Sequence, residues 1–225
     1  MDPVVRFGIG GLAMAVAAVV AGMVWVADRR RFPAVLGAII AIMAIQFAAA
    51  ASGLLRPWDR TPPLIAPLIA IALVLTVLLA FSRTGDAVVG KLSVSALVAF
   101  QVFRLPLELV MHRAATHGIM PMQMSYSGYN FDVISGALAL PVAWAASRSR
   151  QGRVYAWIWN LAGLVLLANI VVIAVISMPS IAAFGPENLN TWVADPPYIW
   201  LPGVLVPCAL LGHLLVFRAL RRRTP

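Results

Sequence analysis

Charged residues and cysteine are scarce in this chain of 225 residues. Only 11% of the residues are charged, whereas 62% are hydrophobic. A water-soluble domain of this length cannot bury that much apolar surface, so the composition predicts an integral membrane protein. The single cysteine, Cys208, excludes an intramolecular disulfide and a cysteine-cluster metal site. Because Cys208 lies in an apolar run, we expect a buried thiol.

The signatures of several protein classes are also missing. The only lysine, Lys91, does not lie in the last apolar stretch, which excludes the Schiff-base lysine of a retinal-type photoreceptor. No histidine pair has the i, i+4 spacing of membrane zinc hydrolases, and no G-x-S-x-G, Walker or dinucleotide-binding sequence is present. The first apolar stretch is followed by three arginines instead of a small-residue cleavage site, so we expect no cleavable signal peptide.

Seven apolar stretches approach the roughly 20 residues that are needed to cross a bilayer. They cover residues 7–26, 33–55, 62–82, 87–111, 131–147, 154–178 and 197–220. Prolines open the third and seventh stretches, where a missing N–H costs nothing, and Asp195 is a candidate N-cap for the seventh. We therefore predict an all-α polytopic membrane protein, with residues 1–225 forming one transmembrane domain of seven helices.

Basic residues are unevenly shared between the two ends of the predicted spans. Twelve fall on one side, namely Arg29, Arg30, Arg31, Arg83, Lys91, Arg148, Arg150, Arg153, Arg218, Arg221, Arg222 and Arg223. Four fall on the other side, namely Arg6, Arg56, Arg60 and Arg113. Because lysine and arginine are enriched in cytoplasmic loops, we expect the N-terminus outside and the C-terminus in the cytoplasm. This distribution explains the net charge of +9 without a nucleic-acid partner.

Three ionisable side chains lie in the outer half of the fourth predicted span and directly after it. Arg104, Glu108 and His112 are spaced i, i+4 and i+8, which puts them on nearly one helix face. Each costs roughly 3 kcal/mol or more at membrane depth, so such residues are rarely idle. Pro106 lies between them, removes a backbone N–H and predicts a kink. Either the three line an outward-opening polar pocket, or an Arg104–Glu108 pair joins neighbouring helices.

The segment before the fifth span offers a second polar wall. Gly128 permits a tight turn, and Asn130 or Asp132 can cap the helix that follows. Alternatively, Asp132 faces Arg104 or His112 across the bundle and completes a site of opposite charges. In the sixth span, Asn160 and Asn169 are about half a turn out of phase, so at least one should hydrogen-bond between helices.

The loop after the fourth span carries residues that are able to bind a soft metal. They are His117, Met120, Met122 and Met124. Imidazole and thioether ligands suit copper(I), although methionine also fills apolar interfaces. Haem would need two histidines that face each other at one depth. We expect His213 near the cytoplasmic end and His112 near the outer end, which makes them a poor pair, so the cofactor is left open.

Several short motifs occur from about residue 100 onward. They are Phe103–Glu108 (FRLPLE), Ser127–Asp132 (SGYNFD), Trp159–Asn160, Trp200–Pro202 and His213. Together they resemble a family of small uncharacterised bacterial multi-span inner-membrane proteins with no assigned activity. The resemblance implies a location in the bacterial inner membrane and supplies no substrate, cofactor or catalytic residue.

Three functional hypotheses follow. In the first, a polar pocket binds or transports a small anionic or amphipathic ligand, with Arg104 as the fixed charge, Glu108 and His112 as a proton-responsive pair, and Asn130 and Asp132 opposite. In the second, Glu108 and His112 serve as acid and base in a membrane-embedded enzyme acting on a lipid-like substrate. In the third, the chain is a non-catalytic accessory subunit of a membrane complex. The expected partners are the lipid bilayer, a small-molecule or lipid ligand and other membrane proteins, but not nucleic acid.

Overall fold

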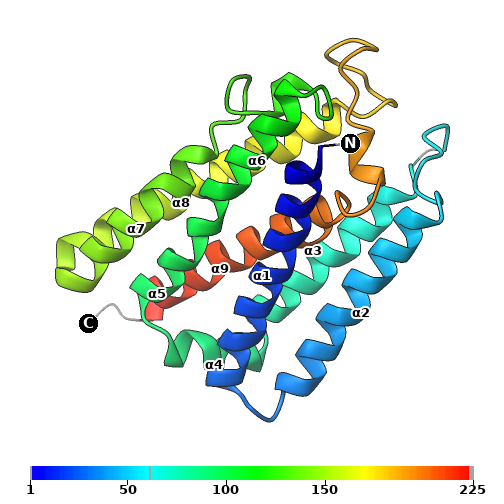
Figure 1. Ribbon diagram of the computed structural model, residues 1–225. Helices are drawn as coiled ribbons and strands as arrows, with labels where there is room; N and C mark the ends of the chain where they lie inside the picture. Colours follow the sequence, from blue (N-terminus) through cyan, green and yellow to red (C-terminus); the bar gives the residue numbers. More distant parts are fainter. Residues whose placement is uncertain (1, 61, 223–225) are drawn as a thin grey trace.

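The computed structural model describes residues 2–60 and 62–222, and this part of the chain is helical without a β-strand. The α-helices are α1 (Pro3–Ala27), α2 (Phe32–Ala51), α3 (Ile65–Phe81), α4 (Arg83–Lys91), α5 (Val94–Ala99), α6 (Arg104–Thr116), α7 (Val133–Arg148), α8 (Arg150–Ile176) and α9 (Val206–Arg222) (Figure 1). A 3-10 turn, η1 (Phe100–Phe103), joins α5 to α6, and a π-helical turn, η4 (Leu201–Leu205), precedes α9. Two further 3-10 turns, η2 (Met122–Met124) and η3 (Trp192–Ala194), lie in the connections. Arg223, one of the predicted basic residues, lies outside the described residues.

Five helical segments in the described ranges are long and apolar enough to cross a membrane. They are α1, α2, the continuous run Val94–Thr116, α8 and the run Leu201–Arg222. The number rises to six if α3 and α4 form one span, since the two are bent by 60° at their junction. The remaining candidate, α7, is a shorter apolar helix of 16 residues. By length and composition, these helices define a membrane protein.

One predicted boundary is wrong. The fourth span was expected at residues 87–111, but the chain is still in α4 at that point and the spanning run begins only at Val94. Ser82 explains the break, because its hydroxyl accepts hydrogen bonds from the N–H groups of Thr84 and Gly85 and so caps a new helix. The predicted N-cap role of Asp195 is also wrong: Asp195 is ion-paired with Arg56 at 3.0 Å, and the helical turn begins at Leu201.

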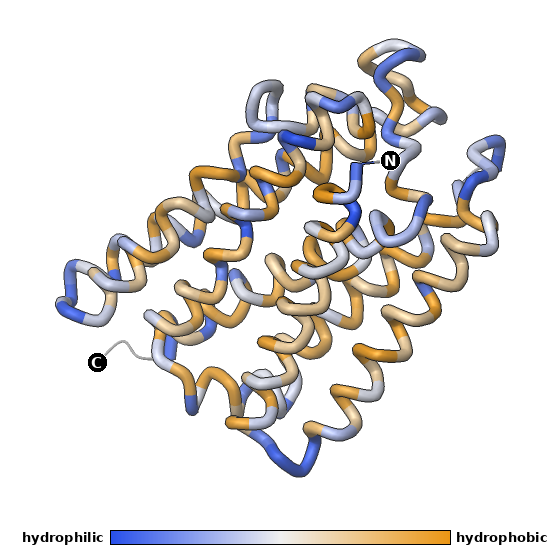
Figure 2. The backbone as a smooth tube through the Cα atoms, in the orientation of Figure 1, coloured by the Kyte–Doolittle hydropathy of each residue, from blue (hydrophilic) through white to orange (hydrophobic). Residues whose placement is uncertain are grey.

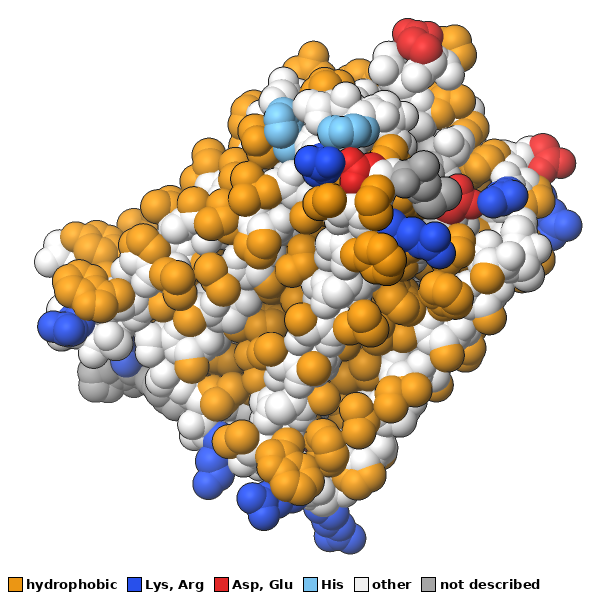
Figure 3. Space-filling view, viewed as in Figure 1, with side chains coloured by type: hydrophobic (Ala, Val, Ile, Leu, Met, Phe, Trp, Pro, Cys, Tyr) orange, Lys and Arg blue, Asp and Glu red, His pale blue; other side chains and the backbone are white. Residues whose placement is uncertain are grey.

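Polar residues gather at the two ends of the bundle, and the stretches between the ends are mainly hydrophobic (Figure 2). In the space-filling view, basic side chains project from the lower end, whereas acidic, basic and histidine side chains mix at the upper end (Figure 3). Apolar side chains cover the surface between the ends (Figure 3). Such a band costs nothing when lipid tails surround it, because lipid is itself apolar.

The centre of the bundle is formed by α9, and α2 lies at its edge. In the most apolar stretch of the Leu201–Arg222 run, 67% of the residues are buried. In the most apolar stretch of α2, only 11% are buried. Two polar contacts hold α2 in place. The buried Gln46 donates from Nε2 to the Gly203 carbonyl oxygen at 3.2 Å, and Trp200 donates from Nε1 to the Met43 carbonyl oxygen at 3.0 Å. Both contacts reach the start of the last span, and α2 also packs along α1.

Asp2 joins the start of α1 to the end of α6. Its carboxylate accepts hydrogen bonds from the Val4 N–H at 2.8 Å and from Arg113 Nε at 2.8 Å. His117 Nε2 lies 3.4 Å from the same carboxylate. Desolvation raises the pKa of Asp2, but the Val4 N–H and Arg113 lower it more, so the net pKa lies below the usual value.

We predict that this contact stabilises the fold in a pH-dependent way. A depressed folded-state pKa means that the stabilisation is present above the unfolded-state pKa of about 4 and is lost as the pH falls through the folded-state pKa. Asp2→Asn keeps a capping side chain but removes the charge. Its melting temperature in detergent should therefore lie below that of the wild type at pH 7, and the two should converge in acid. The exposed Asp59 provides the control, because Asp59→Asn should match the wild type at every pH. A difference for Asp2→Asn that persists well below pH 3 would contradict this.

Candidate functional site

Six buried polar residues from three helices and one loop form a cluster inside the bundle, called the polar cluster below. They are Arg104 and Glu108 on α6, Asn130 and Asp132 at the entry to α7, Asn160 on α8 and His213 on α9. None of the six is more than 4% exposed. Because unpaired polar groups are costly in an apolar environment, the hydrogen bonds among the six determine what the cluster can do.

The strongest contact is a two-pronged ion pair between Arg104 and Asp132. Arg104 Nε donates to Asp132 Oδ2 at 2.9 Å, and Nη2 donates to Oδ1. Counted without the backbone, the Arg104 side chain is 1% exposed and the Asp132 side chain 6%. A planar guanidinium binds a carboxylate in this geometry more strongly than a single hydrogen bond would. Of the two roles expected for Asp132, the structure shows the one that faces Arg104, and its side chain makes no capping hydrogen bond.

His213 occupies the remaining side of Arg104. Arg104 Nη1 lies 2.6 Å from His213 Nε2, and His213 Nδ1 lies 2.9 Å from Asn160 Oδ1. Arginine only donates, so Nε2 must accept, and the ring proton must sit on Nδ1 and be donated to Asn160. The contacts therefore define a neutral imidazole with the proton on Nδ1. They also occupy both ring nitrogens, which leaves neither one open to a haem iron.

Glu108 is linked to the ion pair through Asn130. Asn130 Nδ2 donates to Glu108 Oε2 at 2.7 Å, while Asn130 Oδ1 accepts from the Asp132 N–H at 3.1 Å. A hydrogen-bonded path therefore runs from Glu108 through Asn130, Asp132 and Arg104 to His213. The expected alternative of an Arg104–Glu108 pair is replaced, since the guanidinium is paired with Asp132.

His112, a predicted member of the site, turns away from the polar cluster. Its Nδ1 lies 3.4 Å from Ser125 Oγ and 3.2 Å from Ser127 Oγ, and its ring stacks on Tyr126 with centroids 4.2 Å apart. Eight helical residues separate His112 from Arg104, or about 12 Å along the axis, so a shared face does not mean a shared site. Glu108 and His112 thus have separate partners.

The predicted copper ligands lie in different surroundings. Met120 and Met124 are buried in the apolar core, Met122 is exposed, and His117 lies beside Asp2. In the ranges that the structure describes, no three or more His, Cys, Asp or Glu residues are grouped so that they could hold a metal ion. Met120 and Met124 pack within the core cluster, where methionine fills irregular gaps.

Two glycines allow the helices to approach closely at the polar cluster. A Cβ on Gly136 of α7 would collide with the backbone of Arg104 and Leu105. A Cβ on Gly163 of α8 would lie 2.5 Å from Cε1 and 3.0 Å from Nε2 of His213. Small residues at helix contacts are a common device in membranes, because they let backbones come together. Because Gly163 has no side chain, only the backbone of α8 covers the His213 ring at this point.

Two members of the cluster were not predicted as site residues. His213 was expected near the cytoplasmic end, but it meets Arg104 and therefore lies at the same depth. Asn160 fulfils the expected helix–helix role, because its Nδ2 donates to the His213 carbonyl oxygen at 3.3 Å. A usable signal was present, since Asn160 and His213 are isolated polar residues in apolar runs. Such residues face the bundle interior and seek partners.

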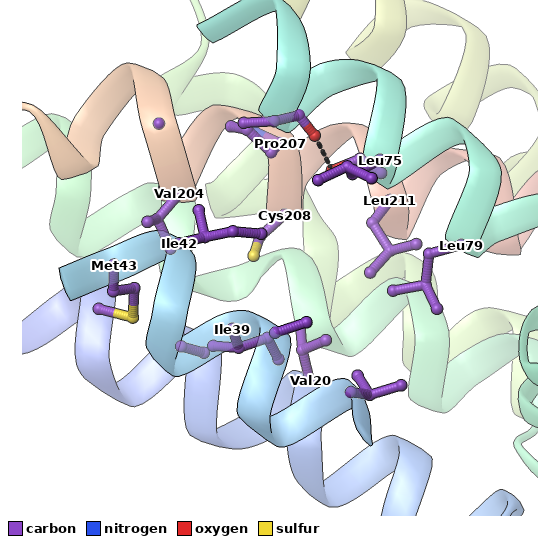
Figure 4. Close-up of a pocket in the computed structure, with 16 residues that line it drawn as sticks. Val20, Ile39, Ile42, Met43, Leu75, Leu79, Val204, Pro207, Cys208 and Leu211 are labelled. Carbon is purple, nitrogen blue, oxygen red and sulfur yellow. Dashed lines mark hydrogen bonds between the residues drawn. The ribbon is translucent and has the colours of Figure 1, made fainter. Parts of the chain in front are cut away.

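A separate apolar cavity of about 210 Å³ lies between α1, α2, α3 and α9 (Figure 4). Carbon atoms of residues such as Ile39, Leu75 and Leu211 dominate its lining, and Cys208 points a sulfur toward it (Figure 4). The Thr76 hydroxyl donates to the Ala72 carbonyl oxygen at 2.8 Å and is thereby satisfied. No residue of the polar cluster lines this cavity, so it is distinct from the candidate site.

Fold and site together define a helical membrane protein with an occluded, charged cluster. Residues 62–221 match the model of a family described as "Domain of unknown function (DUF8737)". Since the match covers well over half of the chain, the chain belongs to this family, in agreement with the expected resemblance to an uncharacterised family. No curated protein and no solved structure is similar enough to match. The six residues of the polar cluster all lie within the matched region.

We predict that the Arg104–Asp132 pair is far more important for stability than an exposed pair of the same kind. Asp132→Asn leaves a buried guanidinium uncompensated and should cost about 3–5 kcal/mol. The matched control is Asp195→Asn, which breaks the exposed pair with Arg56 and should cost no more than about 1 kcal/mol. Unfolding in lipid–detergent micelles measures both. Equal losses for the two variants would show that the buried pair has no special role.

Proposed function

We propose that this chain binds or transports a small anionic or amphipathic ligand, and that the anionic group of the ligand binds Arg104. The observation that carries the proposal is the two-pronged Arg104–Asp132 ion pair, buried within the bundle. A guanidinium is well matched to carboxylate and phosphate groups, which it holds with two parallel hydrogen bonds. In this interpretation, Asp132 occupies the position that the ligand takes.

The location of Asp132 supports this exchange. Arg104 lies inside the continuous helical run Val94–Thr116 and His213 lies within α9, whereas Asp132 precedes α7 at the end of the loop from Met120. A residue at an element terminus can move with less disruption than one within a helix, and such residues commonly act as hinges. Displacement of Asp132 would leave the Arg104 guanidinium free on one side and bound to His213 on the other.

Glu108 is a second ionisable group in the same hydrogen-bonded path. It contacts Asn130 rather than a cation, so a proton on Glu108 can compensate a change of charge at Arg104. We therefore assign Glu108, instead of the Glu108–His112 pair, as the proton-responsive group. The separate partners of Glu108 and His112 favour ligand binding over acid–base catalysis by this pair.

A second candidate function is that of a non-catalytic accessory subunit, in which the polar cluster only joins helices. The observation that favours it is the closure of the cluster, because Arg104, Asp132 and His213 satisfy one another. The two functions differ in one respect. A structural joint has no reason to respond to an added anion.

The setting that we propose is the bacterial inner membrane, with seven spans, an outer N-terminus and a cytoplasmic C-terminus. The excess of basic residues at the end shared by Arg31, Arg150 and Arg222 supports this orientation. We predict that green fluorescent protein fused after α9 is fluorescent in cells, whereas alkaline phosphatase fused in the α8–α9 connection is active. The reverse pattern at either position would exclude this topology.

The binding proposal is tested with two probes, benzoate as a small anion and palmitate as an anionic amphiphile. We predict that a probe that binds the wild type binds Arg104→Lys at least about tenfold more weakly, because lysine cannot form the two-pronged contact. Asp132→Asn should behave in the opposite way. With the competing carboxylate removed, the probe should raise its melting temperature more than that of the wild type, since a ligand stabilises the state that it binds.

The exposed ion pair again provides the controls. Arg56→Lys and Asp195→Asn should respond to each probe as the wild type does. The binding proposal is wrong if a probe raises the melting temperature of Asp132→Asn no more than that of the wild type, or if neither probe binds. Either result favours the accessory interpretation.

A further inference from the structure

We propose that the ligand is a single-chain amphiphile with a carboxylate or phosphate head, and that it enters sideways from the bilayer through a groove between α7 and α8. This inference rests on the proposed anion site at Arg104. It adds the class of the ligand, the position of its alkyl chain and the direction of entry.

The groove has a volume of about 250 Å³ and is lined by the facing sides of the two helices. On α7 its lining runs from Ile134 to Val142, and on α8 it runs from Tyr155 to Leu166. Eight helical residues on α7 span about 12 Å, which accommodates an extended alkyl chain of medium length. A cavity of about 150 Å³ already admits benzene, so the volume suffices for a chain of several carbons.

The walls of the groove are apolar and face outward. Leu138 is 45% and Ile158 62% exposed, and in a membrane such residues contact lipid tails. A ligand that is already dissolved in the bilayer can therefore enter without passing through water. This arrangement favours a hydrocarbon chain over a small hydrophilic anion, which would have no reason to occupy these walls.

At one end the apolar groove borders a buried hydroxyl, that of Ser135. Ser135 is 2% exposed and lines the groove, and within residues 2–60 and 62–222 its Oγ has no hydrogen-bond partner. A buried hydroxyl that makes no hydrogen bond costs about 1–3 kcal/mol, so it is a natural donor for a ligand oxygen. Ser135 lies near the start of α7, far from the α7–α8 turn at Ser149. The head would therefore lie at Ser135, with the alkyl chain directed toward that turn.

The same end of the groove lies next to His213, which contacts Arg104. Gly163 lines the groove, and the position of a Cβ on Gly163 would be 3.4 Å from Ser135 Oγ and 2.5 Å from Cε1 of His213. His213 Nε2 in turn lies 2.6 Å from Arg104 Nη1. An anionic head that binds Ser135 is thus separated from the guanidinium by one imidazole ring. Withdrawal of Asp132 would free the Nε and Nη2 edge of Arg104, and the head would pass beside His213 to reach it.

Trp159 lines this end of the groove and contacts both Ser135 and His213. Its Nε1 donates to the Ser135 carbonyl oxygen at 3.1 Å, and its ring centroid lies 5.4 Å from that of His213. The indole therefore holds α7 and α8 together beside the cluster. Its polar atom is already satisfied. The other hydroxyl of the lining, that of Tyr155, lies toward the α7–α8 turn, so Ser135 is the hydroxyl donor at this end.

The test uses a diazirine-tagged palmitate with the whole protein in lipid nanodiscs. Light should attach the probe mainly to peptides from α7 and α8. Ala162→Phe places a ring in the groove and should lower the labelling at least about tenfold, because this is the effect of losing the contacts of two methylene groups. The matched control is Val165→Phe. Val165 is exposed on the same helix but does not line the groove, so labelling should be unchanged.

A second pair of variants covers the case in which Ala162→Phe does not fold. Leu138→Trp fills the groove from α7, and Leu140→Trp, on the same helix but outside the groove, is its control. The inference is overturned if the groove-filling variants and their controls are labelled to the same extent, or if the probe attaches mainly to other helices.

The head group is tested by competition. Untagged palmitate and hexadecyl phosphate, whose alkyl chains match in length, should reduce the labelling, and the stronger of the two identifies a carboxylate or a phosphate head as the natural type. Methyl palmitate has the same chain without the charge and should compete at least about tenfold less well. Equal competition by the ester would show that an anionic head is not required and would overturn the inference.

The inference and the proposed function fail in different ways. If Arg104→Lys weakens palmitate binding but the groove-filling variants do not, the anion site stands and the lateral entry is wrong. If Arg104→Lys binds palmitate as the wild type does, the anion site itself is wrong.

Discussion

The Arg104–Asp132 ion pair is the constraint on which the rest of the bundle depends. Two charges are removed from water here, which costs several kcal/mol for each ion before their attraction is counted. The cost is tolerable only because the contact is two-pronged and because His213 takes the remaining guanidinium donor. Four elements must therefore meet at one depth: α6, the entry to α7, α8 and α9.

Other features of the structure become intelligible from this requirement. Gly136 brings the backbone of α7 against that of Arg104 and Leu105, and Gly163 brings α8 against the His213 ring, so a side chain at either position would collide. Pro106 lies in the first turn of α6, directly after the 3-10 turn at Phe100–Phe103, and cannot provide the N–H that a regular helix would use there. The chain therefore changes here from a 3-10 turn to an α-helix, and α6 begins at Arg104. Helix α2, which contributes nothing to the polar cluster, is the least buried of the long helices.

The sequence was sufficient to predict an all-α membrane protein and to identify four members of the cluster. Arg104, Glu108, Asn130 and Asp132 are polar residues next to or within apolar runs, and their cost in lipid makes them visible. His112 was predicted on the same face but lies apart from the cluster, with Ser125, Ser127 and Tyr126 as partners, because helical periodicity defines a face but not which depth of that face meets another helix. His213 and Asn160 were visible as isolated polar residues, but their pairing depends on how α8 and α9 pack, which local sequence does not encode. The α3–α4 bend was not predicted, because the average hydropathy of the stretch is apolar and does not show that Ser82 caps a new helix.

The most direct test of this account is the protonation state of His213 in the reconstituted protein. Solid-state nitrogen NMR of histidine-labelled protein, with His112 and His117 replaced, reports which ring nitrogen carries the proton. The account predicts a neutral ring at pH 7 with the proton on Nδ1, because Arg104 can only donate to Nε2. A proton on Nε2, or a doubly protonated ring, would contradict the contact between Arg104 and His213 and with it the closed cluster.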